Sequence, residues 1–186
     1  MALQPVTPPP QVLATYQASL LDFGMPAVKE VSLYHLPVGA LALDDLASGA
    51  TLAQVRASGC RFVARWPNGD TTSAEMTNPS LYGLAKFRNF VTGDPPAVVL
   101  QRIAEAAGLP QVQATDYDLH FLSAPGILFE GLHLISDGQA SDLVLPTASW
   151  YTELPVTAVL NAADFLTVAS ALARARLAYG AAELSS

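Results

Sequence analysis

Apolar residues recur at helical spacing near both ends of the chain. In residues 11–24 they form one stripe that ends at Gly24, and glycine is favoured just after a helix. In residues 161–180, Asn161 is a good N-cap and Gly180 a good stop. The two stripes consist of Leu13, Tyr16, Leu20 and Phe23, and of Phe165, Val168, Leu172, Ala175 and Tyr179. We therefore predict a helix at each end of the chain.

Helix start and stop signals predict three more helices between these two. Residues 51–59 open with a capping-box pattern and stop at a glycine. Residues 78–93 and 94–108 each open with a capping residue and a proline, and each ends at a glycine. This pair could be mistaken for a DNA-binding helix-turn-helix, but Arg102 is the one base in the second helix.

Alternating residues indicate strands between the helices. Asn68-Gly69 lies between two strand-like runs in residues 60–76 and is the strongest short hairpin signal. A turn at this dipeptide pairs Trp66 with Thr71 and Phe62 with Glu75. Strands are also predicted at residues 31–36 and through most of residues 111–145, where Pro125-Gly126 can turn the chain.

These elements predict one α+β domain over residues 11–186. Its antiparallel sheet is built largely from hairpins and is packed by about five helices. Residues 1–10 contain four prolines and predict a flexible arm that precedes the domain.

The segment Thr115–Phe121 places Asp116, Asp118 and His120 at every second position. Alternate side chains of a strand face opposite ways, so these three share one face. The simplest interpretation is a solvated face of a half-buried strand. Carboxylates and imidazoles together also suit zinc, manganese or iron, or acid–base catalysis, so these residues are candidate catalytic residues.

A tight turn at Pro125-Gly126 would add a second histidine to this face. Ala124 would then pair with Ile127, and Asp118 would lie opposite His133. A loop longer or shorter by one residue would bring Glu130 onto the face instead. No recognised metal-ligand spacing is present, so we predict neither a metal nor a cofactor.

Single residues elsewhere have structural explanations. His35 shares a strand face with apolar residues and is expected to be a core or interface residue. Cys60 is expected to be a buried small hydrophobe, which fits a residue between Gly59 and Phe62. Asp137 and Asp142 are expected to lie in a solvated turn, without the spacing of a calcium loop.

Three aromatic residues are candidates for a pocket or a protein interface. Trp150 and Tyr151 adjoin a turn, and Trp66 shares a face with Phe62. Aromatic side chains supply much of the contact area in such sites. The commoner alternative is that they anchor loops to the core.

Composition narrows the classes of function. Only 13% of the 186 residues are charged, the formal net charge is −7, and the two lysines are Lys29 and Lys86. This balance disfavours nucleic acid and anionic membrane surfaces as partners. No apolar run is long enough to span a bilayer, no secretory signal is recognisable, and a single cysteine cannot form an internal disulfide. These features favour the cytoplasm, and the Ala-rich, Lys-poor usage is typical of a bacterial source.

The chain lacks the common nucleotide-binding, esterase, zincin and redox motifs. Three hypotheses follow, and they leave open whether the protein is an enzyme. The leading one is a non-catalytic interaction or assembly module that acts as a homo-oligomer, most simply a dimer, because so few charges favour a buried surface. The second is a small metal-binding or acid–base enzyme that uses the Asp/His cluster. The third is a small-molecule binding module with an apolar pocket near a tryptophan.

Overall fold

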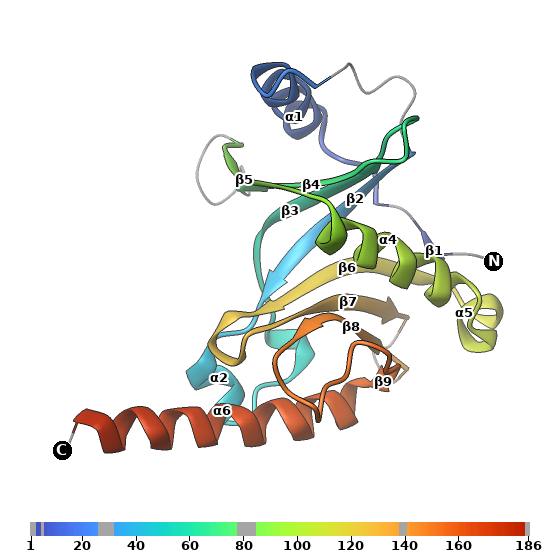
Figure 1. Cartoon of the computed structure of the whole chain (residues 1–186). Helices are drawn as coiled ribbons and strands as arrows, with labels where there is room; N and C mark the ends of the chain where they lie inside the picture. Colours follow the sequence, from blue (N-terminus) through green and yellow to red (C-terminus); the bar gives the residue numbers. More distant parts are fainter. Residues whose placement is uncertain (1–2, 5, 26–31, 78–84, 138–140, 185–186) are drawn as a thin grey trace.

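The computed structural model describes residues 3–4, 6–25, 32–77, 85–137 and 141–184 (Figure 1). The α-helices in these ranges are α1 (Pro10–Asp22), α2 (Leu43–Ala47), α4 (Asp94–Ala107), α5 (Pro110–Ala114) and α6 (Ala162–Leu184). The strands are β1 (Leu3–Gln4), β2 (Ser32–Ala40), β3 (Arg56–Arg65), β4 (Thr71–Thr77), β5 (Phe87–Thr92), β6 (Tyr117–Ala124), β7 (Phe129–Ser136), β8 (Leu143–Ser149) and β9 (Leu160–Asn161). Two 3₁₀ turns, Leu52–Gln54 and Pro125–Ile127, complete the chain's regular elements in the described ranges.

The described strands form one sheet in the order β5-β4-β3-β2-β6-β7-β8-β9, with β1 paired to β6. The predicted α+β class is therefore confirmed, and most neighbours are antiparallel hairpins as expected. The sheet is nevertheless mixed, because β6 runs parallel to both β1 and β2. Hairpin signals specify only neighbours along the chain, so they gave no indication of these two parallel pairings.

The sheet consists of two antiparallel runs that meet at a narrow parallel seam. Strands β2 to β5 form the upper half-sheet, and strands β6 to β9 form the lower half-sheet (Figure 1). The seam between them pairs only Val38–Ala40 of β2 with Phe121–Ser123 of β6. The N-terminal arm extends the same edge of β6, where Leu3 lies opposite Tyr117.

Each helix covers a different part of the sheet (Figure 1). Helix α1 packs on the upper half-sheet, where Tyr16 stacks on Phe62 at 4.2 Å between ring centroids. Helix α4 covers the opposite face across the seam through Val99, Leu100 and Ile103. Helices α2 and α6 cover the lower half-sheet, where Phe165 packs on Phe129. One face of the sheet thus carries α1 at one end and α2 with α6 at the other.

The first hairpin forms where Asn68-Gly69 predicted it, but in a different register. Arg65 pairs with Thr71 and Phe62 with Ala74. The observed register differs from the expected one by one residue, because the loop is longer than the two residues of a tight turn. The last bond before the loop is donated by the Trp66 amide to the Asp70 carbonyl at 2.9 Å. The predicted faces are correct, since Cys60, Phe62, Ala64 and Trp66 all pack under α1.

Two predicted helices are largely replaced by strands. Phe87–Thr92, within the helix expected at residues 78–93, is strand β5 and pairs with β4; residues 78–84 lie outside the described part. The capping box of Thr51 and Gln54 exists, but it closes a single 3₁₀ turn before β3 begins. In both places tertiary packing outweighs the local helix signals, because Phe87 and Phe90 of β5 pack against the core under α1 and β3 pairs with both β2 and β4.

The other helix predictions are correct in place and less accurate at their ends. Helix α1 ends before Gly24, whose φ of +69° is the left-handed value expected after a helix. Asn161 caps α6 by accepting a hydrogen bond from the Asp164 amide at 2.8 Å. Helix α6 continues through Gly180 instead of stopping there, and α5 occupies part of a region predicted to be strand.

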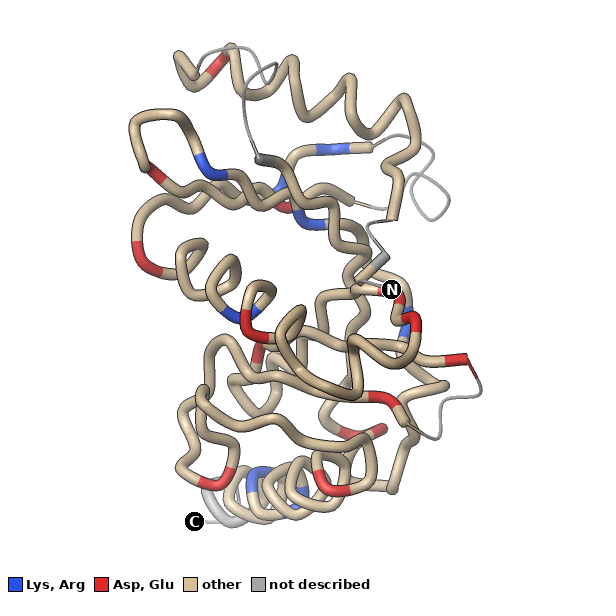
Figure 2. The backbone as a smooth tube through the Cα atoms, turned by 90° about the vertical axis from the view of Figure 1, so that its right-hand side faces the viewer, with Lys and Arg blue, Asp and Glu red and all other residues tan. Residues whose placement is uncertain are grey.

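Charged residues are sparse along the backbone (Figure 2). None of the helices in the described part of the chain is both long enough and apolar enough to cross a bilayer.

Candidate functional site

The two histidines of the lower half-sheet lie directly opposite each other. His120 on β6 pairs with His133 on β7, whereas a tight turn at Pro125-Gly126 would have placed Asp118 opposite His133. The correction arises because the chain reverses through four residues, Pro125 to Leu128, so that Ala124 pairs with Phe129. Directly opposite side chains in an antiparallel pair have Cβ atoms about 4.5–5.5 Å apart, so the two imidazoles are neighbours.

The carboxylates predicted for this cluster do not all join it. Asp116 is exposed and precedes β6, and Asp118 is exposed and lies opposite Ile135. Asp118 still acts on His120 through its charge, which raises the pKa of that imidazole against the larger effect of burial. Glu130 pairs with Ser123 and lies on the opposite face, beneath α4, so it is not part of the histidine cluster.

A buried carboxylate that the sequence assigned to a solvated turn supports His133. Asp142 is only 2% exposed, and its Oδ2 lies 3.1 Å from Nε2 of His133. Its Oδ1 accepts hydrogen bonds from the amide of Ser136 at 2.8 Å and from the hydroxyl of Ser136 at 3.0 Å. Strand alternation puts Asp142 on the face of Val144, but the β7–β8 register is needed to place Val144 opposite His133.

These contacts fix the proton positions on His133. The carboxylate of Asp142 accepts, so Nε2 carries the hydrogen and Nδ1 carries the lone pair. Burial lowers the pKa of His133, and the hydrogen bond and charge of Asp142 oppose this only in part. Burial also lowers the pKa of His120, with a further lowering by the nearby His133. Both imidazoles are therefore neutral at neutral pH.

The third histidine of the chain lies on the same face. His35 on β2 is buried, and its Nδ1 donates to the carbonyl of Val6 in the N-terminal arm at 3.0 Å. Its Nε2 is buried and has no hydrogen-bond partner in the described structure. The expectation of a core residue is confirmed, but this nitrogen is an unsatisfied acceptor. Burial lowers the pKa of His35.

Two adjoining cavities bring these histidines to one groove between α1 and the α2–α6 layer. The larger has a volume of about 330 Å³ and is lined by His120, His133 and apolar residues of β2, β3 and the 3₁₀ turn before β3. The smaller has a volume of about 240 Å³ and is lined by His35, Cys60 and the N-terminal arm. Pro37 and Gly59 line both cavities. We call this region the histidine groove.

Cys60 lies in the smaller cavity as a buried side chain, as predicted. Burial raises the pKa of its thiol to about 12, with a further contribution from the charge of Glu75. The thiolate is the reactive form of cysteine, so Cys60 is a poor nucleophile.

The opposite face of the sheet carries an ionic cluster that joins the two half-sheets. Arg61 on β3 donates from Nη1 to Glu130 on β7 at 2.9 Å and lies over the ring of Phe121 at 3.8 Å. Glu75 lies between Arg61 and Arg88, at 3.4 Å and 3.0 Å. Two arginines and two carboxylates balance in charge, and this cluster bridges β3, β4, β5 and β7.

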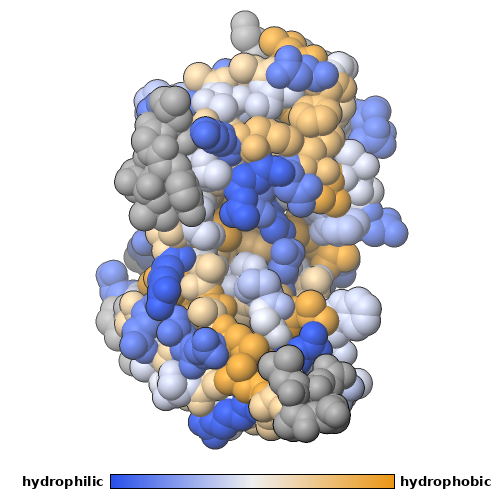
Figure 3. All heavy atoms as spheres, turned by 90° about the vertical axis from the view of Figure 1, so that its left-hand side faces the viewer, coloured by the Kyte–Doolittle hydropathy of each residue, from blue (hydrophilic) through white to orange (hydrophobic). Residues whose placement is uncertain are grey.

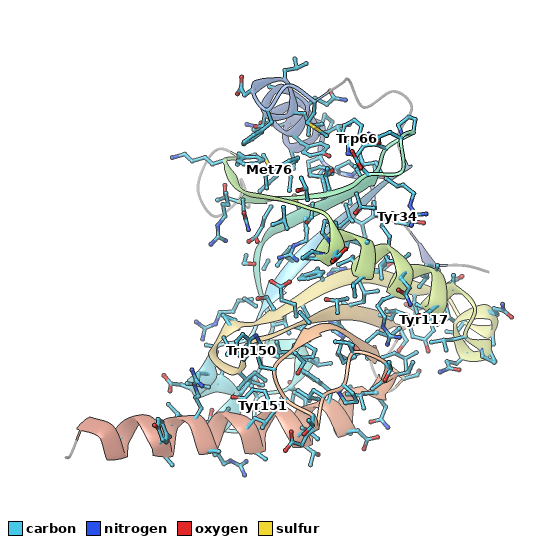
Figure 4. All side chains as sticks on the ribbon, viewed as in Figure 1. Tyr34, Trp66, Met76, Tyr117, Trp150 and Tyr151 are labelled. Atoms are coloured by element: carbon cyan, nitrogen blue, oxygen red, sulfur yellow. The ribbon has the colours of Figure 1, made fainter. Side chains whose placement is uncertain are left out.

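The three aromatic candidates have different environments. Trp66 lies in the upper half of the molecule, and Trp150 and Tyr151 lie in the lower half (Figure 4). Trp66 is buried under α1, and its indole N–H donates to the hydroxyl of Thr72 at 3.0 Å. Tyr151 is partly buried against the core of the lower half-sheet. Trp150 is 83% exposed. None of the three lines the two cavities described above.

Trp150 belongs to an apolar surface at the end of the lower half-sheet. Phe129 pairs with Ser149 in the last rung of the β7–β8 ladder, so Leu128 and Trp150 each adjoin that rung in the chain and lie at the same end of the half-sheet. Leu128 is 40% exposed and has a φ of +49°, a left-handed value unusual for leucine. We call Leu128 and Trp150 the tip surface. Figure 3 shows that apolar residues reach the surface in both the upper and the lower part of the molecule, with hydrophilic residues between them.

No group of three His, Cys, Asp or Glu side chains in the described residues is arranged to hold a metal ion. Comparison with protein families, with curated protein sequences and with solved structures finds no match for this chain.

Proposed function

We propose that the protein is a non-catalytic assembly module that acts as a homo-oligomer, most simply a dimer, through the tip surface. The observation that carries this proposal is the 83% exposure of Trp150, at the same end of the lower half-sheet as the exposed Leu128. Tryptophan is enriched among the residues that dominate binding energy in protein interfaces. Covering a side chain of this size with another protein surface removes a large apolar area from water, which favours association.

The chemistry around the tip surface supports the same proposal. No charged residue occurs from Phe121 to Phe129 or from Leu143 to Thr152, so both chain segments at the tip are charge-free. The centres of protein interfaces are depleted in charged residues. A second copy of the chain presents the same uncharged surface, which makes a two-fold, self-complementary contact chemically consistent.

The interface requires more than two residues. A stable interface buries roughly 800 Å² on each partner, which corresponds to about 20–30 residues. Further exposed apolar residues are available on the following loop, Val156 and Val159, and on α6, Leu177 and Tyr179. We propose that the contact extends from the tip surface onto one of these two segments.

The test is native mass spectrometry of the untagged protein at micromolar concentration, compared with a Trp150→Ser, Leu128→Asn variant. The wild type should be an even-numbered oligomer and the variant a monomer. The control is Leu21→Ser, which removes an exposed apolar side chain from the other end of the molecule and should remain oligomeric. A monomeric wild type, or a variant that assembles like the control, contradicts the proposal.

A second candidate function is acid–base chemistry in the histidine groove, favoured by the pairing of Asp142 with His133. A carboxylate that orients an imidazole leaves the other ring nitrogen available as a general base. Hydrolysis of 4-nitrophenyl acetate provides a first test. The rate should fall in His133→Phe, and equal rates in the two proteins would argue against this candidate.

The proposed setting is the cytoplasm, without a nucleic-acid or membrane partner. The buried, unpaired Cys60 and the acidic composition support this proposal. Arg102, the base on the helix that could have been mistaken for a DNA-reading element, is buried and donates to Glu105 and to the carbonyl of Ala158. Binding to DNA cellulose at low salt would contradict the proposal.

A further inference from the structure

We propose that the histidine groove binds a small organic molecule with an apolar body and one hydroxyl group, which donates a hydrogen bond to Nδ1 of His133. This inference goes beyond assembly of the protein and does not depend on it. It concerns the larger cavity, which lies on β2, β6 and β7 and is walled by the segment from Leu52 to Ala57.

The hydrogen bond from His133 to Asp142 selects a ligand group that donates to His133. His133 gives its Nε2 hydrogen to Asp142, so its remaining nitrogen, Nδ1, accepts. His35 gives its Nδ1 hydrogen to the Val6 carbonyl, so its buried Nε2 also accepts. Two imidazoles from different strands thus present lone pairs on the same face. His35 lines only the smaller cavity, so Nδ1 of His133 is the acceptor for a ligand hydroxyl in the larger one.

The size and lining of the cavity determine the rest of the ligand. An apolar cavity of about 150 Å³ is sufficient for benzene, so a volume of about 330 Å³ accommodates a substituted ring. Apart from the two histidines, the lining residues are apolar in type, and Leu52, Val55, Leu122 and Ile135 are the larger ones on this face. Val38 and Phe121 pack in the core under α4, so they line the cavity with backbone. A phenol has the required combination of an apolar ring and one strong donor.

The charges around the groove disfavour an acidic ligand. No lysine or arginine is among the residues that line either cavity. The charged groups next to the imidazoles are Asp118, exposed on β6, and Asp142, buried before β8, and both are acidic. A carboxylate ligand would require a protonated histidine, which burial opposes. The site therefore distinguishes a phenol from the carboxylate of the same size.

Three probes of similar shape test this selectivity: p-cresol, toluene and p-toluate. Binding is followed by NMR titration of the full chain at neutral pH, with observation of the histidine ring nitrogens. We expect p-cresol to bind and to shift the Nδ1 signal of His133. Toluene should bind about fivefold more weakly, the factor for one hydrogen bond, and p-toluate more weakly still.

A conservative change at Asp142 should reverse the preference of the groove. In Asp142→Asn the side-chain amide can donate to Nε2 of His133, which moves the ring hydrogen to Nδ1. The groove then presents a donor, so p-cresol should bind about fivefold more weakly and 4′-methylacetophenone, an acceptor, should bind more tightly. The matched control is Asp137→Asn, an exposed residue that directly follows β7, which should behave like the wild type.

The ring nitrogen spectrum of the wild type tests the proton positions without any ligand. A lone pair on Nε2 of His133 would overturn the proposal, whether or not the Asp142 variant folds. Equal affinity for p-cresol and toluene would overturn it, since the hydroxyl would then play no part. Tightest binding of p-toluate, or no binding of p-cresol at millimolar concentration, would overturn it as well.

Discussion

The β3–β4 hairpin and the β6–β7 hairpin both reverse the chain with a residue of positive φ, but their tips have opposite chemistry. The first tip uses Gly69, with a φ of +90°, beside Asn68 and Asp70, whose side chains are hydrogen-bonded to each other at 2.7 Å. The second uses Leu128, which is exposed at the same end of the half-sheet as the exposed Trp150. Glycine adopts this conformation without strain, whereas leucine does not. The first tip therefore turns the chain without backbone strain, whereas the second places an exposed leucine in a strained conformation.

The largest expected effect comes from breaking the link between the two hairpins. Arg61→Ala removes the bond from β3 to Glu130 on β7 and the contact with Phe121, and it leaves two carboxylates close together. We expect a loss of about 3 kcal/mol in the free energy of unfolding, measured in urea. Arg65→Ala, an exposed residue on the same strand, is the control. Equal losses in the two variants would show that the link contributes no stability.

The second-largest expected effect comes from placing leucine, the residue of the β6–β7 tip, at Gly69 in the β3–β4 tip. Gly69→Leu should lower the free energy of unfolding by about 1–2 kcal/mol, because leucine is strained in the left-handed region. There is open space around the position a Cβ atom would occupy, so the cost is conformational rather than steric. Thermal unfolding at fixed protein concentration measures it. A variant as stable as the wild type would remove the contrast between the two tips.

Lowering the pH should destabilise the β6–β7 hairpin more than the β3–β4 hairpin, because the β6–β7 hairpin carries His120 and His133, two of the three histidines. The pKa values of His35, His120 and His133 lie below the ordinary value of 6.5, chiefly through burial. The unfolded chain therefore takes up protons that the folded chain does not. The contribution of the neutral histidines to the free energy of unfolding is complete above about pH 6.5. It is lost as the pH falls toward the folded pKa values, by at most about 1.4 kcal/mol per pH unit for each histidine.

Urea unfolding across this pH range provides the measurement. His133→Gln should reduce the dependence of stability on pH, while Asp118 and Asp142 remain as the acidic neighbours of the groove. A variant whose stability falls as steeply as that of the wild type would exclude His133 as a source of the loss.

The smallest expected effect on stability comes from relaxing the second tip. Leu128→Gly removes the left-handed strain but adds freedom to the unfolded chain, so the free energy of unfolding should change by less than about 1 kcal/mol. Assembly, measured by sedimentation at several concentrations, should weaken nonetheless. A large loss of stability would mean that Leu128 serves the fold rather than a contact.

Local signals predicted several elements of the fold well. Three signals act through residues next to them in the chain, so the sequence located the elements they mark. They are Asn68-Gly69, the proline and glycine at the ends of α4, and the Asn161 cap. Strand β5 was missed because its helix-like punctuation was outweighed by pairing with β4. The α+β class followed from hairpins and helices together, whereas the parallel seam depends on residues about 80 positions apart, for which no local pattern exists.

The candidate site could be predicted only in part for the same reason. The alternation in Thr115–Phe121 placed Asp118 and His120 on one face, and His120 does lie in the groove. His133 was named as well, but its partner depended on a turn two residues longer than a tight one. Asp142 was assigned to solvent because polar loop residues usually are exposed, and only the β7–β8 register shows that it is buried beside His133.

The narrow seam between the half-sheets also has a consequence for the order of folding. Each half-sheet joins strands that follow one another in the chain, so each can form from short loops, while the three-residue ladder between β2 and β6 must close a loop across the whole upper half. We expect two cooperative folding units, the upper one complete earlier during synthesis. The seam would then be the last ladder to form and the first to open.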